Sequence, residues 1–113
     1  MNKVNLDRTK LFVSEIGFGC GPLGSNEWGR YDDKDTINAV AKAYDIGINY
    51  FDTAPWYGLG RSEHRIGNAL REIDRNKFII STKVGRILST NKPDTKPLQE
   101  YAFWQDENKP FDG

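Results

Sequence analysis

Apolar stretches that suit buried strands alternate with amphipathic stretches that suit helices, and this alternation restricts the fold more than any other feature. Residues 15–21, 48–52 and 77–84 are apolar runs of strand length. Residues 34–45 and 62–75 carry apolar side chains at helical spacing. Strands that alternate with helices of this length are typical of right-handed βαβ units and a parallel sheet. The sequence therefore predicts an α/β fold, either an open doubly wound sheet or part of a barrel.

The ends of these segments carry the residues that start and stop secondary structure. Polar residues 7–10 between two short apolar runs predict a β-hairpin ahead of the first parallel strand. Asp32 or Asp33 can cap the first helix, Gly47 suits its end, and Ser62 is the predicted cap of the second helix. The apolar stripe of the first helix is predicted to be Ile37, Val40, Ala41 and Tyr44. That of the second helix is predicted to be Ile66, Ala69, Leu70 and Ile73.

Composition excludes several classes of protein. The 113 residues carry no net charge, with 28% charged and 37% hydrophobic residues, as expected for one soluble domain. No apolar run approaches the roughly 18 residues of a membrane span, and the N-terminal residues do not resemble a signal peptide, so a cytoplasmic protein without membrane contact is expected. Charges of both signs are interspersed, which argues against nucleic-acid binding. One cysteine, Cys20, and one histidine, His64, predict neither a disulfide nor a metal site. His64 lies off the helical stripe and is expected on the solvated surface.

The predicted sheet is incomplete. Residues 1–85 hold three parallel strands and two helices, whereas residues 86–113 indicate a long loop or a disordered tail. Three such strands leave both sheet edges without a partner. The sequence therefore predicts that the fold is only part of a larger sheet.

Candidate catalytic groups follow two of the predicted strands. Asp52 and Lys83 lie thirty-one positions apart, about one βαβ unit, so they can form an ion pair at the carboxyl edge of the sheet. Tyr57 can fold over this pair from the loop that follows Asp52. A phenol has a pKa of about 10, which a nearby ammonium lowers, and this suits proton transfer to or from a carbonyl or alcohol oxygen. Residue types and spacing alone favour the structural interpretation, in which Tyr57 is an ordinary packing residue and Lys83 is solvated.

The segments "FDTAPWYGLGRSE" and "IISTKVG" resemble two motifs of the aldo-keto reductases, Asp-Thr-Ala-x-x-Tyr-Gly-x-x-x-x-Glu and Ser-Thr-Lys. "LFVSEIGFGCGPLG" resembles the first strand of that family, after its N-terminal hairpin. The three motifs occur in the family's order and cover about residues 4–86. Pro55-Trp56 and the run Gly19-Cys20-Gly21-Pro22 look closest to the branch that oxidises free aldoses, such as fucose-type sugars, or pyridoxal.

This resemblance implies a TIM (β/α)8 barrel that transfers a hydride between NAD or NADP and an aldose, aldehyde or alcohol. Tyr57 would be the acid–base group, Lys83 would lower its pKa, and Asp52 would pair with Lys83. Asp52 and the strand end Gly19-Cys20-Gly21 would lie against the nicotinamide. The predicted substrate-pocket residues are Trp28 and Trp56. The branch resemblance leans to NAD.

The resemblance also has a limit. The family's catalytic histidine follows its fourth strand, and most of its cofactor-binding loops come later, beyond these 113 residues. The chain corresponds to about three eighths of a barrel, and by itself it is predicted to be inactive. The alternative is a non-catalytic barrel fragment that associates with itself or a partner through open sheet edges. A lysine that forms a Schiff base is a third reading, disfavoured because Asp52 would keep Lys83 charged.

Overall fold

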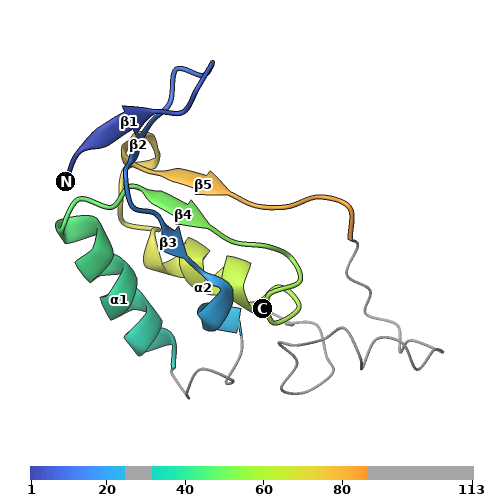
Figure 1. The fold of residues 1–113 in the computed structure, drawn as a ribbon. Coiled ribbons are helices and arrows are strands. Elements are labelled where there is room, and N and C mark those ends of the chain that lie inside the picture. Colours follow the sequence, from blue (N-terminus) through green and yellow to red (C-terminus); the bar gives the residue numbers. More distant parts are fainter. Residues whose placement is uncertain (25–31, 87–113) are drawn as a thin grey trace.

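The computed structural model describes residues 1–24 and 32–86 of the chain. A β-hairpin is followed by a parallel sheet with both of the described α-helices on one face of it (Figure 1). The hairpin consists of β1 (Lys3–Asn5) and β2 (Phe12–Ser14), and the sheet has the order β3 (Phe18–Gly19), β4 (Tyr50–Asp52), β5 (Ile79–Ser81). This confirms the predicted hairpin and βα units, arranged as in the first part of a barrel, and the described residues form no closed barrel.

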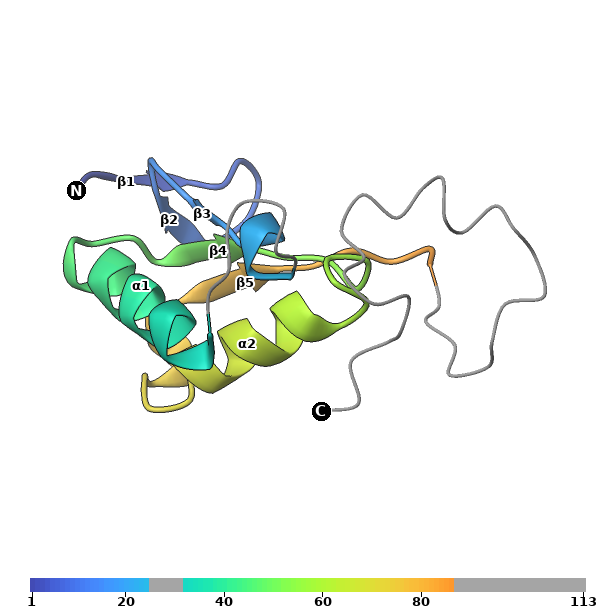
Figure 2. The same cartoon turned by 90° about the horizontal axis from the view of Figure 1, so that it is seen from below.

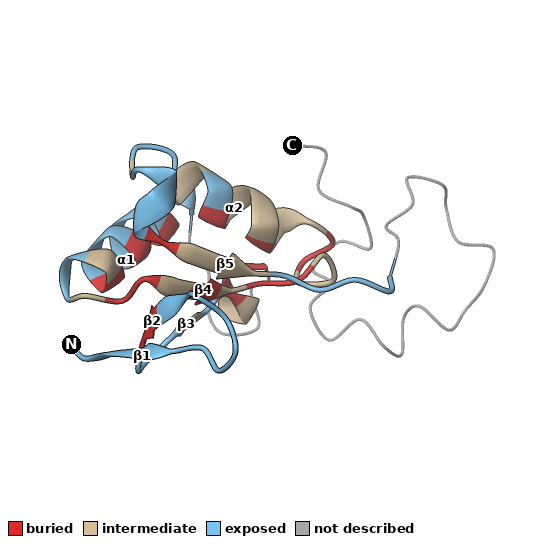
Figure 3. Ribbon diagram, turned by 90° about the horizontal axis from the view of Figure 1, so that it is seen from above, coloured by how far each residue is buried: buried red, intermediate tan, exposed pale blue. Residues whose placement is uncertain are grey.

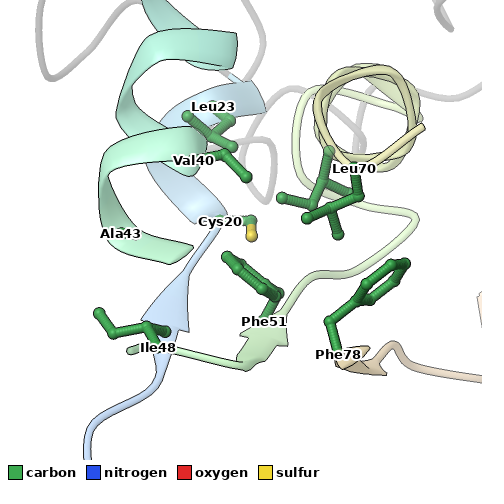
Figure 4. Packing of buried hydrophobic residues seen from close by; sticks show 9 residues of the cluster. Cys20, Leu23, Val40, Ala43, Ile48, Phe51, Leu70 and Phe78 are labelled. Atoms are coloured by element: carbon green, nitrogen blue, oxygen red, sulfur yellow. The ribbon is translucent and has the colours of Figure 1, made fainter. Parts of the chain in front are cut away.

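The two helices α1 (Asp33–Asp45) and α2 (Arg61–Ala69) lie side by side against the sheet (Figure 2). Two short 3₁₀ helices, η1 (Gly21–Gly24) and η2 (Arg75–Lys77), follow β3 and precede β5. The hydrophobic core lies between the helices and the sheet, and Figure 4 shows its packing. It consists of Cys20, Leu23, Val40, Ala43, Ile48, Phe51, Ile66, Leu70 and Phe78.

Alternation along β4 decides which side chains reach the core. Phe51 is fully buried against the helices, so its neighbours Tyr50 and Asp52 point to the opposite face of the sheet. In the parallel register Asp52 pairs with Gly19 of β3 on one side and with Ser81 of β5 on the other. The face away from the helices therefore carries polar side chains at its carboxyl end.

The hairpin is attached to the opposite end of the sheet. Its strands pair antiparallel, and the Leu6 amide donates to the Leu11 carbonyl across the turn at 2.9 Å. The buried side chain of Asn49, next to β4, accepts from the Ser14 amide at 2.6 Å and donates to the Phe12 carbonyl at 3.0 Å. The amino-terminal end of the sheet is thus closed by hydrogen bonds to backbone groups.

Helix α1 begins as predicted but buries a different face. Asp32 is the N-cap and forms a capping box with Asp35, and Gly47 beyond the C-terminus has a φ of +101°. The buried residues of α1 are Thr36, Val40 and Ala43, seen as red segments of the helix in Figure 3. The predicted stripe is confirmed at Val40 and wrong at Ile37 and Ala41, which are exposed. Thr36 can face inward because its hydroxyl donates to the Asp32 carbonyl at 3.2 Å, which satisfies the polar group.

Helix α2 is shorter than predicted, and its cap is not Ser62. The N-cap is Gly60, with a φ of +100° and no side-chain capping bond, and the helix ends at Ala69 rather than near Arg75. Ser62 is buried in the first turn, where its hydroxyl donates to the Cys20 carbonyl at 2.6 Å. The Ser62 hydroxyl thus hydrogen-bonds to the end of the neighbouring strand β3 instead of capping its own helix.

The strands are also shorter than the apolar runs predicted. In residues 15–21 only Phe18–Gly19 pairs, because the chain turns into η1 at Gly21. Residues 82–84 extend past the sheet, and Val84 is fully exposed. The described residues contain no helix long and apolar enough to span a membrane.

Candidate active site

Asp52 and Lys83 form the predicted ion pair at the carboxyl edge of β4 and β5. The Lys83 ammonium lies 3.0 Å from Asp52 Oδ2 and 3.3 Å from Oδ1, and it also donates to the Thr53 carbonyl at 2.9 Å. The two side chains are 49% and 42% exposed, so solvent screens the pair and it contributes little to folding. The ion pair fixes the position of Lys83, whose own segment makes no sheet contacts.

The same interactions shift the pKa values of both groups. Burial acts to raise the pKa of Asp52, but hydrogen bonds from Ser81 and Lys83 and the charge of Lys83 outweigh it and lower this pKa. Burial acts to lower the pKa of Lys83, but Asp52, with a smaller contribution from Tyr57, outweighs it and raises that pKa. At neutral pH the site therefore holds a carboxylate and an ammonium.

Tyr57 lies beside this pair, in the loop between β4 and α2. The Lys83 ammonium is 5.1 Å from the centroid of its ring. The loop is held by a close backbone contact, because a Cβ on Gly58 would lie 1.9 Å from the Gly24 carbonyl oxygen. Gly58 also has a φ of +66°, which favours glycine. Tyr57 is therefore positioned by a glycine–glycine contact with η1.

A cavity of about 310 Å³ opens beside Tyr57 and Lys83. Its other lining residues are Ala54, Pro55, Trp56, Val84 and Arg86. The Arg86 guanidinium lies 4.8 Å from the centroid of the Trp56 ring. Trp56 thus lines a cavity beside Tyr57 and Lys83, and its place in a substrate pocket stays a prediction. Trp28 lies outside the described residues, as does nearly all of the predicted loop or tail 86–113.

The end of β3 lies next to Asp52 and leaves room for a ligand. Gly19 pairs with Asp52 in the register, and a Cβ on Gly19 would meet no atom within 4 Å. A flat ring can therefore approach the backbone of β3 at Gly19, and contact between a nicotinamide and Gly19, Cys20, Gly21 or Asp52 stays a prediction. Cys20, between the glycines, points away into the core and is fully buried (Figure 4). Burial, with a further contribution from Asp52, raises the pKa of its thiol to about 12, so it is not a nucleophile at neutral pH.

Several residues that build the site were missed in the sequence. Ser81 donates to Asp52, and Thr82 donates to the Glu63 carboxylate at 2.6 Å, which ties the segment after β5 to α2. Gly24 and Gly58 form the contact behind Tyr57. The one signal in the sequence is that all of these residues fall inside the three quoted motifs.

His64 is half-buried rather than solvated. Its Nε2 lies 2.9 Å from Nδ2 of Asn68, one helical turn further along α2. No group of three or more potential metal-ligating side chains occurs among residues 1–24 and 32–86. The absence of a metal therefore stays a prediction for the whole chain.

The parallel βα arrangement carries an aspartate, a lysine and a tyrosine at its carboxyl edge, which is where TIM-barrel enzymes have their active sites. The sequence profile of the aldo/keto reductase family matches residues 15–108, and the chain belongs to this family. Members of this family use nicotinamide cofactors and have the TIM barrel fold, which confirms the family and fold expected from the motifs.

Individual relatives are consistent with this assignment. The chain is similar to L-galactose dehydrogenase of Arabidopsis thaliana, with 42% identity over 83 residues, which are 72% of this chain and 26% of the relative. It is also similar to pyridoxal 4-dehydrogenase of Microbacterium luteolum, with 43% identity over 90 residues, 77% of this chain and 25% of the relative. The chain spans about a quarter of the length of these curated relatives.

A solved structure supports the same conclusion. The holo form of an aldo-keto reductase from Bacillus halodurans superimposes with a TM-score of 0.66 at 39% identity, covering 75% of this chain and 26% of that one. The similarity thus covers most of the described fold.

Proposed function

We propose that the chain supplies part of the active site of an NAD(P)-dependent oxidoreductase, which transfers a hydride between the nicotinamide and an aldose, aldehyde or alcohol. The observation that carries the proposal is the Asp52–Lys83 ion pair beside Tyr57 at the mouth of a cavity. Family membership supports the reaction class. When bound, the nicotinamide supplies or accepts the hydride at the carbonyl carbon.

Each of the three polar residues has a separate task in this proposal. Tyr57 gives a proton to the carbonyl oxygen during reduction and takes it back during oxidation. Lys83 stabilises the phenolate that this transfer leaves, because its ammonium is close to the tyrosine ring. Asp52 holds the ammonium in place through two short N–O distances. Gly19, Gly21 and Asp52 would lie against the nicotinamide, with the Cys20 side chain turned away from it.

The cavity indicates what kind of substrate fits. Its lining residues include the apolar Ala54, Pro55 and Trp56 together with Tyr57 and Lys83. Such a pocket suits a small carbonyl compound or sugar whose reactive oxygen points to the polar end. The names of the two curated relatives, which act on L-galactose and pyridoxal, favour an aldose or a pyridoxal-like aldehyde. The leaning to NAD and a cytoplasmic location belong to the same proposal.

Activity is best tested in a chimera, in which this chain replaces the matching quarter of the Bacillus halodurans reductase. We expect the chimera to oxidise aldoses or pyridoxal with NAD or NADP. Tyr57→Phe should lower kcat/KM by about 10²-fold or more, because it removes the transferable proton. Tyr44→Phe on α1 is the matched control and should have no effect. A folded chimera that shows no hydride transfer, or full activity in Tyr57→Phe, would contradict the proposal.

The isolated chain is expected to be inactive, since its described residues form three parallel strands and a barrel has eight.

A second candidate function is a non-catalytic module that associates through its exposed surfaces. One observation favours it: Phe12 and Ile16 are 59% and 57% exposed, and β3 and β5 each pair on one side only among the described residues. Sedimentation of the isolated chain separates the two functions. A stable oligomer together with an inactive chimera would favour the module, whereas an active chimera would favour the enzyme.

A further inference from the structure

Two hydroxyl groups stand behind Asp52 on the face of the sheet that points away from the helices. Tyr50 lies two residues before Asp52 on β4, and Ser81 is the register partner of Asp52 on β5. The Tyr50 hydroxyl lies 3.1 Å from Ser81 Oγ, and Ser81 Oγ is hydrogen-bonded to Asp52 Oδ1. The three side chains form one row that ends on the carboxylate facing Lys83.

The direction of every hydrogen bond in this row follows from the ion pair. An ionised carboxylate has no proton, so Asp52 can only accept. Ser81 must therefore use its single proton toward Asp52, and toward Tyr50 its oxygen can only accept. Tyr50 must then donate its proton to Ser81. All donors in the row point toward Asp52, and each bond strengthens the next one.

We propose that Ser81 and Tyr50 are positioning residues, which hold the Asp52 carboxylate ionised and turned so that its Oδ2 faces Lys83. The effect of Ser81 and Tyr50 on catalysis rests on the function proposed above. Their effect on the Asp52 carboxylate does not. Both residues lie on paired strands, and each is partly shielded from solvent. Lys83 lies on the segment beyond β5 and is 49% exposed. The rigid part of the site is therefore the Tyr50–Ser81–Asp52 row, and Lys83 is ordered by it.

The titratable groups around Asp52 are consistent with this role. Lys83 faces it from the segment after β5, Tyr57 from the loop after β4, and Tyr50 from β4 itself, while the Cys20 thiol lies on the core side at the end of β3. Cys20 remains a thiol at neutral pH, so its charge does not oppose the carboxylate. The Ser81 hydrogen bond is the largest influence that lowers the pKa of Asp52, ahead of both contributions from Lys83.

The direct test is a carbon-13 NMR titration of the Asp52 carboxyl in the 113-residue chain, with the resonance assigned by its loss in Asp52→Asn. We expect Ser81→Ala to raise the pKa of Asp52 and Tyr50→Phe to raise it by less, since Tyr50 acts through Ser81. Ser81→Thr keeps the hydroxyl and should restore the original titration. Thr82→Val is the matched control, because the Thr82 hydroxyl is bonded to Glu63 instead of Asp52. An Asp52 titration that is unchanged in Ser81→Ala, or in Tyr50→Phe, would overturn the proposal.

The catalytic consequence is tested separately in the chimera. Ser81→Ala should lower kcat/KM by about tenfold, the usual effect of losing one hydrogen bond to a charged group, with the acidic limb of the pH profile moved to higher pH. An altered Asp52 titration with an unchanged pH profile of kcat/KM would support the effect of Ser81 on the carboxylate. It would contradict a role of Ser81 in the reaction. An inactive chimera would contradict the proposed function, while the NMR titration would still decide on Ser81 and Tyr50.

Discussion

Asn49 directly precedes β4 and Asp52 ends it, and both residues make several hydrogen bonds. Asn49 is 7% exposed and bonds to backbone groups of the hairpin, Ser14 and Phe12. The Asp52 side chain is 42% exposed and bonds to side chains, Ser81 and Lys83. One network joins two parts of the chain into a fold, whereas the other arranges charged groups beside a cavity.

The difference shows that the polar groups at the two ends of one short strand contribute differently to stability. A buried amide that satisfies backbone groups is costly to remove, since its partners are left in the interior without hydrogen bonds. An exposed ion pair contributes little to stability, because water solvates both charges when the pair is broken. Its two side chains are therefore not required to hold the fold together. In TIM barrels, residues at the amino-terminal face generally serve stability, and active-site residues lie at the carboxyl-terminal face.

The largest effect is expected for Lys83→Met, which tests whether the carboxyl edge is chemical. In the chimera, kcat/KM should fall by about 10³-fold, because the phenolate of Tyr57 loses its stabilising charge. The free energy of unfolding of the 113-residue chain should change by less than about 1 kcal/mol, as expected for an exposed pair. Lys77→Met, on the exposed η2, is the control and should alter neither quantity. A Lys83→Met variant that retains activity would remove Lys83 from the site.

Gly58→Ala should lower both stability and activity, since Gly58 supports both the fold and the position of Tyr57. The new methyl group would meet the Gly24 carbonyl oxygen at a backbone conformation that favours glycine. We expect the loss of about 3 kcal/mol in the free energy of unfolding, measured by urea denaturation of the chain. Activity of the chimera should fall as well, because Tyr57 is displaced. Unchanged stability would mean that the two backbones are not in contact.

Asn49→Ala tests the opposite edge. It leaves the buried Ser14 amide and the Phe12 carbonyl without their partner, and the expected loss in the free energy of unfolding is about 2 kcal/mol. A chimera that stays folded should keep its activity. Asn68→Ala on α2, whose side chain bonds to the half-buried His64, is the milder control. Equal stability in both variants would contradict the structural role of Asn49.

Gly67→Ala gives the smallest expected effect and is the counterpart of Gly58→Ala. Gly67 lies inside α2, and an added methyl group would meet no atom within 4 Å. The substitution should stabilise the chain by about 0.5 to 1 kcal/mol, because alanine loses less conformational entropy in a helix. A loss of stability in urea denaturation would show that this face of α2 is covered.

Much of the arrangement could be predicted from local sequence. The order of strands and helices followed from apolar periodicity, and residue type narrowed the cap of α1 to Asp32 or Asp33. Asp52 and Lys83 could be paired in advance because both follow strands one βαβ unit apart. The pairing of Asp52 with Lys83 could thus be predicted from their positions in the chain, without knowledge of any contact.

The rest depended on contacts between distant residues. Thr36 replaces Ile37 on the inner face of α1 because its hydroxyl is satisfied locally, which periodicity does not detect. Ser62 resembles a cap but serves the Cys20 carbonyl, forty-two positions earlier. Ser81 becomes part of the site only once the register places it opposite Asp52. Such features require the three-dimensional structure.

The central claim is that the Asp52–Lys83 pair exists for a reaction and not for the fold. The most direct measurement is urea denaturation of Asp52→Asn, compared with the unchanged chain at neutral pH. We predict a change of less than about 1 kcal/mol in the free energy of unfolding, because both partners are exposed to solvent. A loss of about 3 kcal/mol or more, as for a buried ion pair that loses one partner, would make Asp52 a structural residue and contradict the account.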